Sequence, residues 1–163
     1  MSHLYAKSVP VLRHYVTQIG VILHRVDDTA LTFRIADMFP AGQQLAIALG
    51  FALRATYPVC GKELPDMQTD TANKSELLGW HEIVANSLAN LSSADFDAVP
   101  KTISHQAGLA KLEQSTDDYI TLFALPNFFF HLSAGYTALR AAGTPLSKGD
   151  FDGLHSYPAG FSF

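Results

Sequence analysis

The sequence predicts an all-α protein, and the architecture it favours is a four-helix bundle with a short β-hairpin before the last helix and an irregular C-terminal tail. Apolar residues recur at steps of three and four in four separate segments, which is the spacing of a buried helix face. The segments are separated by the proline, glycine and capping residues that start and end helices. A length of 163 residues suits one domain with a sizeable core, which we expect to span residues 1–163.

The first helix is expected within the first 28 residues. Its start is open, because Ser8 can cap it while the preceding residues from Ser2 onward are not loop-like. Asp27 and Asp28 are expected to end it, and residues 29–40 are expected to form a connection. The apolar side chains that define its buried face are Val9, Leu12, Val16, Ile19, Leu23 and Val26.

Two further helices are expected in the middle of the chain. The second follows Pro40, since proline suits a first helical position, and it ends before Pro58. Residues 62–71 read as a loop. Asn73 or Ser75 then caps the third helix. The apolar positions of that helix are Leu77, Trp80, Val84, Leu88 and Leu91.

The last third of the chain combines a hairpin, the most apolar helix and the tail. Two short runs on either side of Gly108 indicate a hairpin over residues 101–112. The last helix must kink or restart at Pro126 and stop at Gly143. Because it is apolar on nearly every side, we expect it to run through the middle of the fold. Residues 144–163 are rich in glycine and proline, so an irregular tail packed on the bundle is expected.

Composition restricts the classes of partner. Charged residues make up only 16% of the chain, below the usual quarter, which favours a homodimer. A net charge of −4 without any basic run argues against nucleic acid. No apolar run is long enough for a membrane span, and no signal peptide is recognisable. One cysteine excludes an internal disulfide and fits a cytoplasmic protein.

A polar pair on the last helix is the leading candidate for a binding site. Asn127 and His131 are four residues apart and therefore share a helix face. Ala134 and Ala138 continue that face and leave room for a ligand or a neighbouring helix. Gln44 heads a face of the second helix, and we expect Gln44, Asn127 and His131 to lie together in the bundle interior and to be buried as a group. The alternative interpretation is a buried histidine whose hydrogen bonds are satisfied within the fold.

Other reactive side chains are interpreted as structural. His81 and Glu82 are adjacent, so they point about 100° apart and do not form a metal-binding pair. His14 and His24 are separated by about 15 Å of helix rise, which is too far to share one ion. Cys60 is expected near a helix C-terminus, where a reactive thiolate is disfavoured.

Three motifs resemble an uncharacterised family of the DinB/YfiT-like superfamily. They are Tyr5-Ala-Lys-Ser-Val-Pro10, then Asp37-Met-Phe-Pro40 followed by Gln44, and Ala124-Leu-Pro-Asn-Phe-Phe-Phe-His131 continuing to Gly143. The resemblance covers residues 4–153. It implies a DinB-like four-helix bundle that is usually dimeric.

Relatives in that superfamily carry a three-histidine metal site, and some are thiol-dependent transferases or isomerases. By that pattern Gln44, Asn127 and His131 would occupy the ligand positions, and only His131 keeps the imidazole. Neutral amides are poor ligands for zinc or nickel. We therefore predict no resident cofactor, although His131 remains a weak candidate ligand for a divalent metal.

Three functions stay open from the sequence. The leading hypothesis is a homodimer that binds a small molecule at Gln44, Asn127 and His131, with a degenerate metal site. The second is a non-catalytic structural or assembly protein, also homodimeric. The third is a metal-dependent transferase or hydrolase with unusual ligands. Whether Gln44 and His131 converge on a cavity separates the first two.

Overall fold

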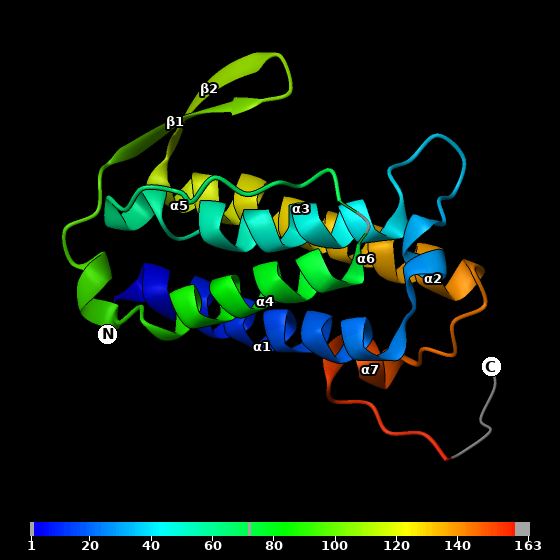
Figure 1. Ribbon diagram of the computed structural model, residues 1–163. Coiled ribbons are helices and arrows are strands. Elements are labelled where there is room, and N and C mark those ends of the chain that lie inside the picture. Colours follow the sequence, from blue (N-terminus) through cyan, green and yellow to red (C-terminus); the bar gives the residue numbers. More distant parts are fainter. Residues whose placement is uncertain (1, 72, 159–163) are drawn as a thin grey trace.

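Four long helices form the body of the protein in the computed structural model, which describes residues 2–71 and 73–158 (Figure 1). Helix α3 packs against α6 and α4, and α1 packs against α4. The apolar faces expected from the sequence meet between them, so that side chains such as Leu12, Leu45 and Phe128 are fully buried. The prediction of a mostly helical chain is confirmed. The four helices are α1 (His3–Arg25), α3 (Ala41–Arg54), α4 (Lys74–Ala89) and α6 (Leu125–Ala141).

The long connection between α3 and α4 sets the topology. After the short 3-10 helix η1 (Pro58–Cys60), residues 62–71 run back along α3 to the other end of the molecule (Figure 1). Lys62 at its beginning pairs with Asp95 at 3.4 Å, whereas the backbone N–H of Lys74 just beyond its end bonds Asp28 at 2.7 Å. Helices α3 and α4 therefore run in the same direction, opposite to α1 and α6.

The N-terminal third settles one open point and differs from the expectation in one place. Helix α1 begins at His3, the earlier of the two starts left open, and Ser8 lies inside it, where its hydroxyl donates to the Leu4 carbonyl at 2.6 Å. Residues 29–40 are not entirely a connection, because a short helix α2 (Asp28–Thr32) begins there. The side chain of Asp27 accepts a hydrogen bond from the Ala30 N–H at 2.8 Å and so caps α2.

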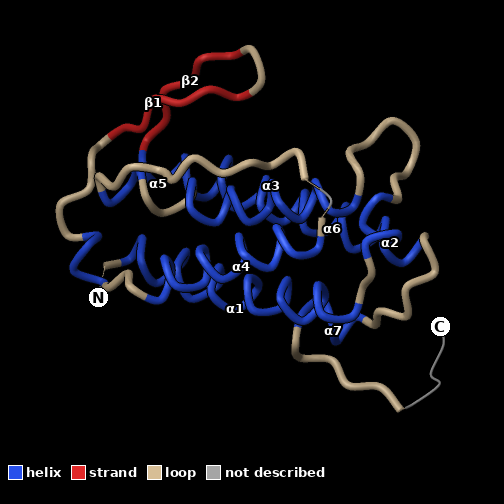
Figure 2. Tube along the Cα trace, viewed as in Figure 1, coloured by secondary structure: helices blue, strands red, loops and turns tan. Residues whose placement is uncertain are grey.

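The predicted hairpin is present and projects away from the helices (Figure 2). Strands β1 (Thr102–Ala107) and β2 (Ala110–Ser115) pair antiparallel and turn at Gly108, whose φ of +57° favours glycine. The hairpin follows a short 3-10 helix, η2 (Ser93–Phe96), in the chain. On its inner face Ile103 is buried against the core.

The last helix is continuous in direction but begins with a wide turn. A short helix α5 (Thr116–Asp118) leads into a π-helical segment η3 (Tyr119–Ala124), and α6 follows with Pro126 in its first turn. Gly143, at φ +90°, ends it as expected. We expected this helix to run through the middle of the fold, but it packs mainly against α3 and leaves Phe130 57% exposed.

The C-terminal tail is not wholly irregular. Helix α7 (Lys148–Asp152) packs on α1, and the side chains of Ser147 and Asp150 form a capping box at its start. The Phe151 ring contacts Tyr136 with centroids 5.3 Å apart, which ties α7 to α6. The expectation that the tail packs on the bundle also covers residues 159–163, which lie outside the described part. Within the described residues, no helix combines the length and the hydrophobicity that a bilayer crossing requires.

Candidate functional site

Close packing between α3 and α6 brings the candidate residues together. Gly135 lies where α6 meets α3, and a Cβ placed there would come within 3.0 Å of a Leu45 methyl and 3.2 Å of the Ala41 carbonyl. Ala138 on the same side is buried. The small residues of α6 therefore let α3 pack closely. The sequence predicts that the small residues of this helix leave room for either a ligand or a neighbouring helix, and a neighbouring helix occupies that room.

Gln44 and His131 form the centre of the candidate site. His131 Nδ1 lies 2.7 Å from Gln44 Oε1, and Gln44 is only 2% exposed. With the amide oxygen as acceptor, Nδ1 carries the ring proton and Nε2 presents a lone pair. Nε2 makes no hydrogen bond to any described residue and reaches the surface. The predicted proximity of Gln44 and His131 is confirmed.

Asn127 shares the face of His131 but does not join this pair. Its amide Nδ2 donates to the Phe123 carbonyl at 2.7 Å, one turn earlier and inside the π-helical segment η3. The wide turn leaves that carbonyl accessible to a side chain. The three residues therefore do not form one closed network, and only Gln44 and His131 bond each other.

Aromatic rings surround the His131 imidazole. The Phe51 ring stacks on it at 5.7 Å between centroids and 15° between planes, and the Phe130 ring meets it edge-on at 5.1 Å. Burial among these rings lowers the pKa of His131, because the charged form loses hydration there. The ring is therefore neutral at physiological pH and acts as a hydrogen-bond acceptor or a weak base.

The three residues that the family resemblance assigns to metal-ligand positions do not fit a transition-metal site. The oxygen of Gln44 already accepts from His131, and Asn127 is directed to the backbone of its own helix. One imidazole and two diverted amides are a poor donor set for zinc or nickel. Among the described residues, no three histidine, cysteine or acidic side chains cluster as metal ligands would.

A second polar and aromatic cluster adjoins the first, and sequence reasoning did not predict it. The Tyr119 hydroxyl donates to the Arg54 carbonyl at 2.8 Å, and burial raises the pKa of this phenol. The His105 ring of the hairpin lies 4.1 Å from that of Phe123 and 4.9 Å from that of Tyr119. Its Nε2 bonds Gln114 at 2.7 Å, whereas its buried Nδ1 has no partner among the described residues.

The remaining candidates have structural partners. His81 bonds the Val16 carbonyl at 3.1 Å, and His14 bonds the Asp152 carbonyl at 2.6 Å. Burial, followed by the nearby carboxylate of Asp95, raises the pKa of Cys60 to about 11, so this thiol is protonated and unreactive at neutral pH.

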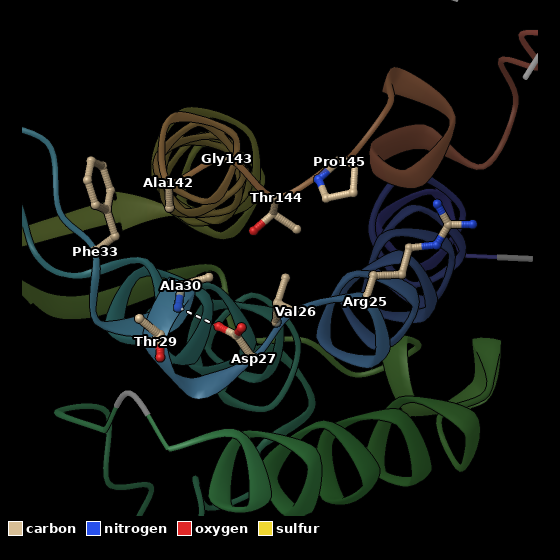
Figure 3. Close-up of a pocket in the computed structure, with 10 residues that line it drawn as sticks. All are labelled: Arg25, Val26, Asp27, Thr29, Ala30, Phe33, Ala142, Gly143, Thr144 and Pro145. Carbon is tan, nitrogen blue, oxygen red and sulfur yellow. Dashed lines mark hydrogen bonds between the residues drawn. The ribbon is translucent and has the colours of Figure 1, made fainter. Parts of the chain in front are cut away.

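A cleft of about 350 Å³ lies between the junction of α1 and α2 and the end of α6 (Figure 3). Its charged groups are already engaged, because Asp27 caps α2 and Arg25 pairs with Asp150 at 2.8 Å. Three further clefts among the described residues lie beside α2, on the hairpin and beneath residues 64–69. Gln44, Asn127 and His131 line none of these four.

Comparisons with known proteins agree with the helical architecture. Residues 4–152 match the family model described as a domain of unknown function, DUF1993. A crystal structure of a DinB family member protein from Shewanella denitrificans superposes with a TM-score of 0.78 at 26% identity. The match covers 96% of this chain and 95% of that one. Among curated proteins, none is significantly similar.

Proposed function

The chain belongs to the family of the domain of unknown function DUF1993, and on that premise we propose that it is a DinB-like four-helix-bundle protein that binds a small molecule beside His131. Helices α1, α3, α4 and α6 make up the bundle, and α2, α5 and α7 are short additions to its connections. The likeness to a DinB family member over nearly the whole chain supports this architecture.

The hydrogen bond between Gln44 and His131 carries the proposal. It holds the imidazole in one tautomer and leaves Nε2 as an acceptor at the surface. The partly exposed Asn127 supplies a further amide oxygen on the same helix face. A ligand that donates an O–H or N–H to Nε2 and rests an apolar part on Phe130 would use all of these groups.

A fragment screen by thermal shift tests the proposal. Ligands that bind the folded protein raise its unfolding temperature, and His131→Ala should abolish that rise. Gln43→Ala, at the neighbouring position of α3, is the matched control and should keep it. If His131→Ala lowers stability yet leaves every ligand-induced rise intact, the pair is a structural network and the proposal fails.

We propose that the metal site of the superfamily is degenerate in this chain. The donor set and the bond between Gln44 and His131 support this view. Elemental analysis of purified protein should find no stoichiometric zinc or nickel. About one transition metal per chain that disappears in His131→Ala would instead support a metal-dependent transferase or hydrolase with unusual ligands.

A non-catalytic homodimer is the second candidate. Two observations favour it: Gln44 and His131 line none of the four clefts described above, and several apolar side chains are exposed. Leu122 is 69% exposed and Phe130 57% exposed, both along η3 and α6, and Phe39 ahead of α3 is 51% exposed. Exposed large apolar side chains are often covered by a partner at an interface. This candidate predicts dimerisation without any response to small molecules.

A further inference from the structure

The second strand of the hairpin, β2, is largely uncovered. All of its residues are exposed except Gln114, which is partly buried. Beyond β1, it packs appreciably only on α5, which directly follows it in the chain. Figure 2 shows the two strands standing clear of the helices. A two-stranded sheet is marginal in water, and its open edges can pair with another strand.

The hydrogen-bond pattern of the hairpin determines which backbone groups of β2 face outward. The two strands pair residue by residue along their whole length. One residue beyond the last of these pairs, the Thr116 N–H donates to the Lys101 carbonyl at 3.0 Å. In an antiparallel pair, residues that exchange hydrogen bonds alternate with residues that do not. Counting back from Thr116, the even-numbered residues of β2 bond β1, and the backbone groups of Lys111 and Glu113 point away from it.

Lys111 and Glu113 also carry charges without an opposite partner. Both are exposed, lie on the same face of the strand and form no ion pair within the described part of the chain. Leu112 between them points to the opposite face and is 39% exposed. A lysine on a strand edge commonly discourages pairing with another strand. Here a glutamate two residues away makes the edge complementary to a second copy of itself.

We infer that β2 pairs antiparallel with β2 of a second copy of this chain, about a two-fold axis at Leu112. This register places Lys111 of each copy opposite Glu113 of the other. Their outward backbone groups then exchange hydrogen bonds, and their side chains attract each other. An axis at Lys111 or at Glu113 puts like charges opposite each other, which is unfavourable. The strand edge therefore has the self-complementarity that a two-fold interface requires.

The pairing joins two hairpins into a four-stranded sheet and brings the two Leu112 side chains together. Strand pairing alone buries little area, so a stable dimer needs further contact. The exposed Leu122 is available for it, because its helix η3 contacts the hairpin through the rings of Phe123 and His105. The inference rests on the homodimer proposed above as the second candidate, and it assigns a surface to that homodimer.

Charge reversal on β2, followed by sedimentation of the full-length protein at roughly tens of micromolar, tests the inference. Lys111→Glu should weaken dimerisation by about tenfold, because it sets a glutamate opposite Glu113 at two symmetric positions. Glu113→Lys should weaken it equally, since two lysines then meet. An equal mixture of the two single variants should dimerise again, because opposite charges face each other in the mixed dimer. Glu82→Lys, at an exposed position of α4, is the control and should leave dimerisation unchanged.

Amide hydrogen exchange gives a second readout. The N–H groups of Lys111 and Glu113 should exchange slowly in the dimer and rapidly after dilution to monomer. Recovery in the mixture shows at the same time that each single variant is folded.

The possible failures are distinguishable. A monomeric wild-type protein overturns both the homodimer and this inference. A dimer that Phe130→Glu disrupts but both charge reversals leave intact keeps the homodimer and overturns the strand pairing. The strand pairing is also overturned if the mixture of variants stays monomeric, or if protection of the two amides does not depend on protein concentration.

Discussion

At the scale of single residues, the Gln44–His131 hydrogen bond invites a direct test of stability. Gln44 is almost fully buried, so Gln44→Leu leaves the Nδ1–H of His131 without its acceptor. We expect a loss of about 1–3 kcal/mol in the free energy of unfolding, measured in urea. Gln43→Leu, one position earlier and partly exposed, is the control and should change little. Equal effects in both variants would contradict a specific role for Gln44.

Two half-buried histidines, His131 and His81, predict a pH dependence of stability. Burial lowers the folded-state pKa of His131, and also of His81, below the ordinary value of 6.5. As pH falls through 6.5, the unfolded chain therefore binds protons before the folded chain does, and stability decreases. The contribution that these neutral histidines make to the free energy of unfolding is therefore fully present above pH 6.5 and is lost as the pH falls.

Urea unfolding at pH about 7.5 and about 5.5 measures this effect. The wild-type protein should be less stable at the lower pH, and His131→Gln should show a smaller difference between the two. His3→Gln, which changes an exposed histidine that does not shift the pKa of His131 or His81, should behave like the wild type. A wild-type stability that rises on acidification over this range would refute the expected sign.

At the scale of elements, the contact between α3 and α6 depends on one glycine. Gly135→Leu places a side chain against Leu45 and the Ala41 carbonyl, so it should cost about 1–3 kcal/mol or more through overpacking. Gly79 on α4 has open space around it, and Gly79→Ala should stabilise the protein by up to about 1 kcal/mol through helix propensity. In thermal unfolding, Gly135→Leu should lower the unfolding temperature and Gly79→Ala should raise it. A change in the same direction for both variants would contradict this prediction.

At the scale of the whole molecule, we expect a homodimer. Phe130 is exposed on α6 and Leu122 on η3, and their burial in an interface would remove apolar surface from water. Sedimentation should show a dimer at roughly tens of micromolar, and Phe130→Glu should shift it to monomer. Ile83→Glu, at an exposed apolar position of α4, is the control. A monomeric wild-type protein would end this prediction.

Local spacing in the sequence was sufficient for much of the architecture. Steps of three and four define the buried faces of the long helices, and Gly108 and Gly143 mark a turn and a helix end because their backbones have positive φ. The same helical spacing, together with the family resemblance, correctly brought Gln44 and His131 together. Asn73 caps α4 as expected, through a side-chain bond to Glu76 N–H.

Features that depend on contacts between distant segments could not be predicted from the sequence and became visible only in the tertiary structure. The π turn of η3 diverts Asn127 to the Phe123 carbonyl, a bond that residue spacing on a regular helix does not predict. The exposure of Phe130 follows from which helices pack around α6, and hydrophobicity alone does not determine that. The Arg54 guanidinium lies over the Phe51 and Phe123 rings and beside the Gln106 carbonyl because α3, η3 and β1 meet in space. Periodicity reports the face of one helix, whereas a site built from three segments exists only once they are packed together.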